Sequence, residues 1–439
     1  MEEVLEENAG NFMIEKKQLI ILTEAGKPVY AYGRDESDLA RTLVFAVECR
    51  YNGADPGALR QLPRKQRGPK VALSLASNLR SVTTTKGYFV FEKIGPLLFF
   101  CYSPKEGTSI LLIHEEFHLL YQQLVMLLST SALSLLQKKP NYDIRELLGN
   151  TTSSITTLIN QCGVNLYYLL RCYHPLLIPS AFRAQIRDIF LRNKRPDTVY
   201  GGLGINDNIV VCLQSRQFPL QPLNQVLLQA LITKTVSFRS SEGWLPVCIS
   251  DVKADAFLHL YVGFVTEETF VFFVTTANNP DDFDVYSKIK DRIYTQLSEG
   301  DRIMQLYSAY DASISIGEMK IPDLIHCVYK NESNQIVIPR MDERVYDYHD
   351  YYKMIRKYQE VYSHMLKNQL SEYYESTSEF SIHASKKDTS LYIVVLSPFL
   401  SIEEMMERKQ QVADWLVKKG DLMIQKAHMF WFCVCSRIV

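Results

Sequence analysis

The chain has 439 residues, of which 47% are hydrophobic and 22% charged, and its formal net charge is −1. This length exceeds what one hydrophobic core usually serves, so we expect roughly two to four domains in an ordinary folded protein. A balanced charge argues against nucleic-acid binding, which needs a basic face. The nine cysteines are an odd number and lie in apolar runs without zinc-ligand spacing, which predicts buried, reduced thiols in a cytosolic protein.

The first residues are acidic and have no apolar core, so we expect no signal peptide. Residues 1–15 are expected to form a short mobile tail. The most apolar helical stretch, 119–136, is interrupted by polar residues and falls short of the roughly 20 apolar residues of a membrane span. We therefore expect a protein that is not integral to a membrane and that could still visit one.

Residues 17–33, KQLIILTEAGKPVYAYG, predict a strand, a tight turn and a return strand. Gly26 can adopt the positive φ that such a turn needs. A helix is expected over 36–49, and its apolar residues form more than one stripe, which is typical of a helix that is deeply buried or shared with a partner. We favour the partner. The candidate binding residues are Leu39, Arg41, Thr42, Phe45, Glu48 and Cys49.

A loop rich in glycine, proline and basic residues follows over 52–70. It is either a solvated flexible loop or a contact for anionic lipid or an acidic partner. Its basic residues are Arg60, Arg64, Lys65, Arg67 and Lys70.

The same order of elements, a hairpin, a helix, further strands and a helix, recurs three times along the chain. In the first unit we expect strands at 79–84, 87–93 and 97–103 and helices at 109–138, 142–148 and 154–170. In the second we expect a helix at 182–192, a hairpin at 199–214, a helix at 223–233, strands at 247–250, 256–265 and 270–275, and a helix at 281–297. In the third we expect strands at 323–329, 335–339, 379–383 and 391–396 and helices at 348–367 and 402–418. This pattern predicts an α/β protein with domains at 16–175, 176–320 and 321–439, each of ordinary domain size.

The sharpest enzymatic signal is the H-E-x-x-H sequence formed by residues 114–118. On a helix, His114 and His118 share a face and could bind Zn²⁺, with Glu115 as general base. However, Glu116 adds a second acid where zinc peptidases usually carry an uncharged residue, and Glu146 is an unconstrained third ligand. We favour a solvated polar first turn of an amphipathic helix, whose acids suit the positive helix end.

Other chemical motifs are weaker. Gly201, Gly202 and Gly204 lie within a predicted strand and lack the dinucleotide-binding spacing, so they more plausibly allow close backbone approach. Neither a P-loop nor a G-x-S-x-G sequence occurs.

Several separated stretches resemble the Mon/SAND family. They are LIILTEAGKPVYAYG, QKKPNYDIRELLGNTTSSITTLI, SSEGWLPVCISDVKADAFLHLYVGFV, NNPDDFDVYSKIKDRIYTQL, KIPDLIHCVYKNESNQIVIP, and SLYIVVLSPFL with WLVKKGDLMIQ. Six such stretches in order over about 17–425 make the likeness specific, whereas 53–77 fits poorly. The family lacks H-E-x-x-H at the corresponding helix.

The resemblance implies three longin-type domains, each a mostly antiparallel sheet flanked by helices. It also implies a non-enzymatic regulator without cofactor or metal: the subunit that, with a Ccz-type longin partner, forms the guanine nucleotide exchange factor of the late-endosomal or vacuolar Rab GTPase. The first domain would meet the partner and the Rab, and the implied process is endosome maturation, vesicle fusion and autophagy. A third subunit and a peripheral contact with anionic, phosphoinositide-containing membranes are allowed for. The alternatives are a longin-type tethering adaptor without exchange activity, and a zinc peptidase.

Overall fold

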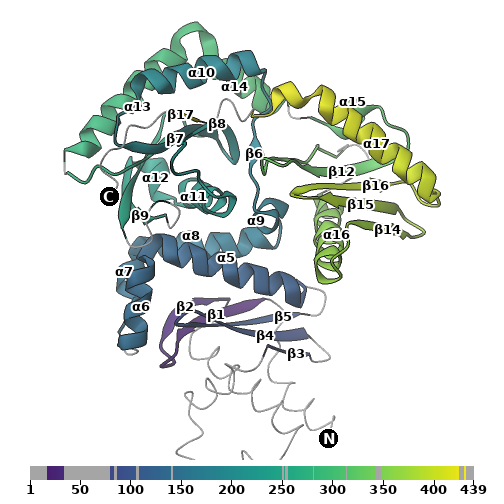
Figure 1. Cartoon of the computed structure of the whole chain (residues 1–439), viewed down its shortest axis with the longest axis horizontal. Helices are drawn as coiled ribbons and strands as arrows, with labels where there is room; N and C mark the ends of the chain where they lie inside the picture. Colours follow the sequence, from purple (N-terminus) through teal and green to yellow (C-terminus); the bar gives the residue numbers. More distant parts are fainter. Residues whose placement is uncertain are drawn as a thin grey trace, which may run out of the picture. The chain divides into compact units, whose positions relative to one another are not determined.

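The structure of the chain is a computed structural model (Figure 1). It describes residues 17–33, 80–83, 87–104, 108–139, 142–249, 252, 256–279, 281–312, 314–341, 346, 348–424 and 430–431. The chain divides into two compact units between Gly163 and Val164. The first unit holds one sheet and the second holds two.

The sheet of the first unit is antiparallel, with strand order β2-β1-β5-β4-β3. The bounds are β1 Gln18–Thr23, β2 Pro28–Tyr32, β3 Ser81–Thr83, β4 Gly87–Ile94 and β5 Leu97–Pro104. The predicted opening hairpin is confirmed. Gly26 has φ 82°, and its N–H donates to the Thr23 carbonyl at 2.8 Å.

The helices of the first unit follow the sheet in the chain. They are α5 Ile110–Leu128, α6 Thr130–Lys138, α7 Arg145–Leu148, the 3₁₀ turn η2 Gly149–Thr151 and α8 Thr152–Cys162. The single helix expected over 109–138 is wrong, because α5 and α6 meet at a bend of 98°. Ser129 makes the break: its φ is 70°, and its hydroxyl accepts the Ala132 N–H at 3.3 Å, so it caps a new helix instead of continuing the old one.

Within the described part of the chain, no single helix is long and apolar enough to cross a bilayer. The helices α5 and α6 reach the length and apolar composition of a membrane span only when they are counted together, across the bend between them.

The second unit begins with a sheet of order β17-β8-β7-β11-β10-β9, to which β6 adds along β8. The strands are β6 His174–Pro175, β7 Thr198–Ile205, β8 Asn208–Ser215, β9 Gly243–Cys248, β10 Phe257–Phe264, β11 Thr269–Thr275 and β17 Phe430–Trp431. The helices are α9 Leu166–Leu170, α10 Ser180–Asn193, α11 Pro222–Lys234, α12 Ser237–Ser240, α13 Asp282–Ser298, the turn η3 Glu299–Asp301 and α14 Arg302–Asp311.

Successive side chains of β11 point to opposite faces of this sheet. Val271 and Phe273 pack with α10, α13 and α14 in one buried cluster. Phe270 and Phe272 point the other way, toward α11. Helices therefore cover both faces, as expected of strands that are buried throughout their length.

The last sheet has order β13-β12-β16-β15-β14 and is also antiparallel. Its strands are β12 Leu324–Lys330, β13 Ile336–Val337, β14 Glu372–Ser376, β15 Ser381–Lys387 and β16 Ser390–Leu396. Its helices are α15 Ile316–Met319, α16 Tyr348–Lys367, α17 Ile402–Lys418 and the turn η4 Gly420–Leu422.

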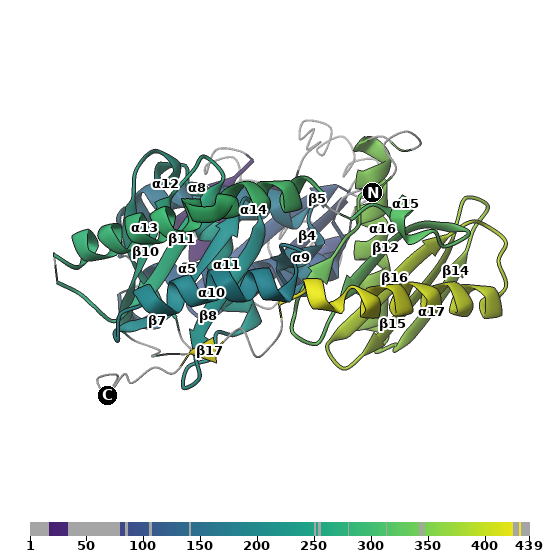
Figure 2. The same ribbon diagram turned by 90° about the horizontal axis from the view of Figure 1, so that it is seen from above.

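The helices α16 and α17 lie on opposite sides of this sheet (Figure 1), and α17 lies over its strands when they are seen from above (Figure 2). Met405, Val412 and Leu416 of α17 share a buried cluster with Val394 of β16. On the other face, the Tyr358 hydroxyl of α16 lies 2.6 Å from His326 Nδ1 of β12.

Three sheets of this kind, each with flanking helices, confirm the predicted α/β class. Six cysteines fall within the described residues and all six are free thiols, five of them buried, in agreement with the expected reduced state. Burial raises the pKa of Cys101, Cys212 and Cys327 to about 12, which makes them unreactive packing residues.

Candidate functional site

The residues predicted to bind a partner or lipid lie outside the described part of the structure, as does the expected tail 1–15. They are Leu39, Arg41, Thr42, Phe45, Glu48 and Cys49, and Arg60, Arg64, Lys65, Arg67 and Lys70. The sheet nevertheless constrains their connection. β2 and β3 are the opposite edge strands of the first sheet, so residues 34–79 must lead from one edge to the other. In the two later sheets the equivalent connections contain α11 and α16. The predicted helix 36–49 thus has the same place in the order of elements and stays a prediction.

The two histidines of the H-E-x-x-H sequence share one face of α5, as the spacing predicted, and both contact Glu92 of β4. His114 Nδ1 lies 2.6 Å from Glu92 Oε2, and His118 Nε2 lies 3.3 Å from Glu92 Oε1. Burial alone would raise the Glu92 pKa. The hydrogen bond with His114 and the charges of His114, His118 and Arg80 outweigh it and hold that pKa below 4.5. This carboxylate fastens α5 to the sheet through both imidazoles.

The next acid of the motif, Glu116, lies inside the unit and not in a solvated first turn, so this expectation is wrong. α5 begins at Ile110 with Ser109 as its N-cap, which places Glu116 beyond the first turn, and its side chain is 3% exposed. It forms an ion pair with Lys17, the residue before β1. Burial lowers the Lys17 pKa, but the Glu116 charge and hydrogen bond together raise it above its ordinary value.

Among the described residues, no group of three or more His, Cys, Asp and Glu side chains is placed to hold a metal ion. The ring nitrogens His114 Nδ1 and His118 Nε2 are engaged by Glu92. The geometry therefore gives the motif a structural role, and it offers a zinc peptidase no support.

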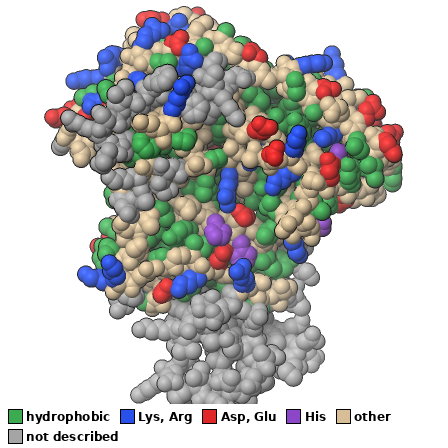
Figure 3. All heavy atoms as spheres, in the orientation of Figure 1, with side chains coloured by type: hydrophobic (Ala, Val, Ile, Leu, Met, Phe, Trp, Pro, Cys, Tyr) green, Lys and Arg blue, Asp and Glu red, His purple; other side chains and the backbone are tan. Residues whose placement is uncertain are grey.

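Ion pairs in the second unit also fasten helices to their sheets. Lys290 of α13 lies 2.5 Å from Glu242, next to β9, and Lys357 of α16 lies 2.7 Å from Glu375 of β14. Over the face drawn in Figure 3, acidic and basic side chains are interspersed and form no large field of one sign. The ion pairs named here join helices to the strands beside them.

The glycine-rich stretch of β7 makes room for aromatic rings of β11, which confirms the predicted close approach. A Cβ atom on Gly201 would lie 2.7 Å from the Phe273 ring, and one on Gly202 would lie 2.7 Å from the Phe272 ring. Real Cβ atoms do not come so close. These glycines serve the packing of β7 against β11.

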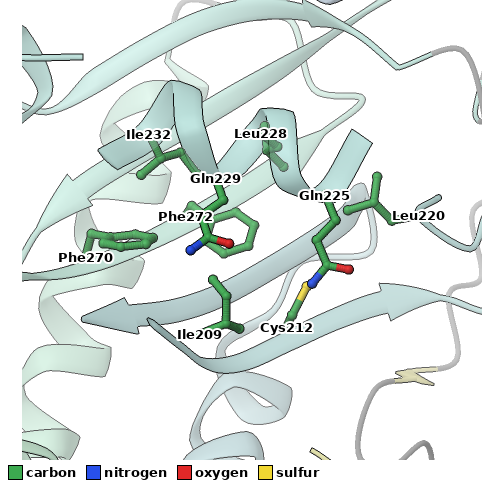
Figure 4. A pocket seen from close by; sticks show the side chains of 9 residues that line it. All are labelled: Ile209, Cys212, Leu220, Gln225, Leu228, Gln229, Ile232, Phe270 and Phe272. Atoms are coloured by element: carbon green, nitrogen blue, oxygen red, sulfur yellow. The ribbon is translucent and has the colours of Figure 1, made fainter. Parts of the chain in front are cut away.

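A small pocket lies between α11 and the strands β8 and β11 (Figure 4). Its walls are mostly apolar and are made by Ile209, Cys212, Leu220, Gln225, Leu228, Gln229, Ile232, Phe270 and Phe272. Its free space is about that of one water molecule. Gln229 Nε2 already donates to the Asp207 carbonyl at 2.6 Å. The pocket is thus a packing gap beneath α11, too small for a larger ligand.

Sequence reasoning missed Glu92, because the partner of His114 comes from a strand that only the folded sheet brings close. It also missed the exposed apolar residues Ile402, Met406 and Val417 of α17. A signal for these was present: the apolar positions of 402–418 extend beyond the single face that a core needs.

Comparison with known proteins finds a match for each sheet-containing part of the chain. Residues 70–158 match the family model described as "First Longin domain of FUZ, MON1 and HPS1", and residues 196–295 and 323–420 match the models of the second and third longin domains of the same proteins.

Curated relatives agree with these matches. The chain is 25% identical over 344 residues to "Vacuolar fusion protein MON1 homolog A" of Bos taurus, covering 78% of this chain and 58% of that protein. It is 27% identical over 315 residues to the Arabidopsis thaliana homologue, covering 70% and 47%. It is 23% identical over 412 residues to "Protein SAND" of Takifugu rubripes, covering 92% and 75%. The chain spans about half the length of several of the curated relatives it matches.

Proposed function

Because the chain belongs to the Mon/SAND family of proteins with three longin domains, we propose that it acts in vacuolar and late-endosomal fusion as a subunit of a guanine nucleotide exchange factor. The activated protein would be the late-endosomal or vacuolar Rab GTPase, and the second subunit a Ccz-type longin protein. The observation that supports this most is the succession of three matching longin domains in one chain, together with relatives named vacuolar fusion protein.

The proposed activity needs a binding surface and no acid–base chemistry. An exchange factor binds the nucleotide-free GTPase more tightly than the GDP-bound form, so binding opens the switch region and GDP leaves. Such differential binding is consistent with the described acids and bases, whose pairs hold helices on sheets. The chain would act as a regulator and would carry no bound cofactor.

We place the exchange surface in the first domain, on the connection between β2 and β3. This connection joins the two edges of its sheet, and its expected helix carries two apolar stripes, of which one can pack on the sheet while the other meets the Ccz-type subunit or the Rab. The residues proposed to bind are Leu39, Arg41, Thr42, Phe45, Glu48 and Cys49. The chain would work from the cytoplasm, recruited peripherally to late-endosomal or vacuolar membranes, and a third subunit is compatible with this assignment.

The decisive experiment measures release of fluorescently labelled GDP from the Rab. The full chain is co-purified with its Ccz-type partner, and the complex is mixed with labelled Rab and excess GTP. The proposal expects rapid loss of fluorescence with the complex and slow loss with either subunit alone. If the assembled complex leaves the GDP release rate unchanged, exchange activity is excluded.

Substitution of the expected helix refines the test. Leu39→Asp or Phe45→Asp should weaken partner or Rab binding more than about tenfold, because a charge would replace an apolar anchor. Leu147→Asp is the matched control in the same unit, since Leu147 of α7 is 52% exposed. Circular dichroism distinguishes lost binding from lost folding. Equal binding by all three variants would remove this helix from the surface.

The same assay separates the alternative of a longin-type tethering adaptor. An adaptor would bind the Ccz-type partner stably and leave the GDP release rate unchanged. The zinc peptidase alternative would need a third ligand placed beside His114 and His118, and among the described residues no group of three or more His, Cys, Asp and Glu side chains is so placed.

A further inference from the structure

One flank of α17 in the third longin domain carries an unusual concentration of exposed apolar side chains. Eleven large hydrophobic residues in the described part of the chain remain well exposed, and four of them belong to α17 or the residue three positions before it. They are Phe399 at 79%, Ile402 at 52%, Met406 at 50% and Val417 at 76%. Exposed apolar residues gathered in one place mark an interaction site more often than scattered ones do.

Helical spacing places three of these residues in one row. Ile402, Met406 and Val417 share a flank, with the half-buried Ala413 between the last two. The core-facing side of the helix is a different one. Its residues, Met405, Val412 and Leu416, are each at most 5% exposed. The row therefore exceeds what packing on the sheet requires.

Contacts on each side of α17 show which way the row faces. Arg408 Nε lies 3.4 Å from Asp323 Oδ2, at the start of β12. Lys409 Nζ lies 5.7 Å from the centre of the Tyr392 ring of β16. By helical rotation the apolar row adjoins Lys409, away from Arg408. The apolar row therefore faces the side of the sheet on which β15 and the edge strand β14 follow β16.

Phe399, three residues before the helix, is a further exposed apolar residue. Its φ is 67°, a left-handed backbone conformation that glycine or asparagine adopts far more easily than a bulky residue. The next residue, Leu400, packs against the buried cluster beneath α17, so the turn carries Leu400 inward and leaves Phe399 outside. An aromatic ring at a strained, exposed position suggests selection for contact, because it stabilises little in the isolated chain.

A row of acids runs beside the apolar row. Each of these acids directly follows a residue of the apolar row in the sequence. Glu403 follows Ile402, Glu407 follows Met406 and Asp414 follows Ala413, and all three acids are exposed. Arg408 Nη1 lies 3.3 Å from Glu407 Oε1, which offsets part of this charge. In Figure 3, acidic and hydrophobic side chains adjoin toward the right-hand edge of the view, where α17 begins. Lys409 borders the row on the flank toward the sheet, where its Nζ lies over the Tyr392 ring, so the acids border the outer flank. There they would repel an anionic lipid surface and also a second copy of the same row.

We propose that Phe399, Ile402, Met406 and Val417, bordered by Glu403, Glu407 and Asp414, form a docking surface for an amphipathic helix of a partner protein. The partner helix would place apolar residues in the row, as one helix packs along another, and would carry Lys or Arg beside them. This surface lies in the third domain. It is therefore additional to the exchange surface proposed for the first domain and does not depend on it.

Fluorescence anisotropy with the full chain tests the proposal. The probe is a labelled synthetic helical peptide with leucines at helical spacing bordered by lysines, and a matched peptide carries glutamates in their place. The lysine peptide should bind the wild-type chain, and the glutamate peptide at least about tenfold more weakly. Met406→Asp and the pair Glu403→Gln with Glu407→Gln should each weaken lysine-peptide binding at least about tenfold, whereas Met406→Leu should preserve it.

Met304→Asp is the matched control, because Met304 of α14 is a methionine on another helix and is 63% exposed. It should bind the lysine peptide as the wild type does, and thermal unfolding checks that all variants fold. Failure of the lysine peptide to bind, or equal binding to Met406→Asp, would overturn the proposal. The proposal would also be overturned if the chain floated with phosphatidylserine vesicles and Met406→Asp removed that binding. Self-association of the chain that Met406→Asp abolishes would overturn it as well.

Discussion

The guanidinium of Arg183 in α10 donates a hydrogen bond from Nη2 to the carbonyl oxygen of Leu422, 2.6 Å away in the turn after α17. The same atom donates to the Leu176 carbonyl at 2.7 Å, and Nη1 donates to the Val210 carbonyl of β8. Arg183 is 1% exposed, and burial lowers its pKa to about 10. This one side chain joins the second longin domain to the end of the third within the second unit.

We predict that Arg183→Met lowers the free energy of unfolding by about 3 kcal/mol, because buried carbonyls lose a charged donor. Arg187→Met on the same helix should change it little, since Arg187 pairs with the adjacent, exposed Asp188. Urea unfolding monitored by circular dichroism measures both. Equal stability of the two variants would mean that water or a shifted backbone replaces the guanidinium.

The ion pair of the partly exposed Lys17 with the buried Glu116 predicts that substitutions of the two residues have non-additive effects on stability. Lys17→Met should destabilise the chain by about 3–5 kcal/mol, because the Glu116 charge is left buried without its partner. The double variant Lys17→Met with Glu116→Leu should recover most of that loss. Lys93→Met should cost under about 1 kcal/mol, since Lys93 and its partner Glu24 are 44% and 43% exposed. Additive losses in the double variant would contradict a coupled pair.

The lowered pKa of Glu92 predicts that the free energy of unfolding depends on pH in the acidic range. Its pKa in the folded chain lies below 4.5, so the folded state binds the proton less readily than the unfolded state. Its contribution is therefore present above the ordinary pKa of a glutamate and is lost as the pH falls through the lower folded pKa. Glu92→Gln should therefore be less stable than the wild type while Glu92 is ionised and should approach the wild type in acid. Unfolding at several pH values measures this, with Glu24→Gln as the control that should show a smaller change.

The glycines of β7 predict a steric effect. Gly202→Ala should destabilise the second domain by about 1–3 kcal/mol through overpacking, since its Cβ would overlap the Val211 carbonyl oxygen of β8 and lie 2.7 Å from the Phe272 ring of β11. Gly163→Ala should be tolerated, because the nearest atom to its Cβ is 3.7 Å away. Thermal unfolding compares the two, and a stable Gly202→Ala would show that β8 and β11 can both shift to admit the methyl group.

The basic loop predicts a lipid contact. Reversing Arg64, Lys65 and Arg67 to glutamate should weaken binding to phosphoinositide-containing vesicles, by about 1 kcal/mol for each charge that lies near the surface. Vesicle flotation measures the bound fraction. Lys138→Glu with Lys139→Glu, both exposed at the end of α6, is the control. Unchanged flotation of the loop variant would leave the loop as a solvated connection.

Local signals predicted the elements whose causes are local. The hairpin β1–β2 follows from an apolar run on each side of a turn that contains Gly26. The apolar period of 348–367 predicted α16 with its observed bounds. The bend at Ser129 was missed, because apolar residues continue on both sides and only the cap geometry divides the helix.

Strands that depend on a distant partner were also missed. β14 reads EYYES, which is charged and short, and it is a strand because it pairs with β15. β6 and β17 have two residues each and exist as strands only along β8. In the same way, the sequence placed His114 and His118 on one helical face, but it could not show that Glu92 contacts both.

The spacing of apolar residues and the threefold recurrence of hairpin, helix and further strands thus come from the sequence alone, because each depends on neighbours within about one element. The tertiary structure decided which charges are buried, which side of α17 remains apolar and exposed, and what the H-E-x-x-H residues do. Burial and pairing depend on segments far apart in the chain, as with Lys17 and Glu116, 99 positions apart, and they exist only once those segments have packed together.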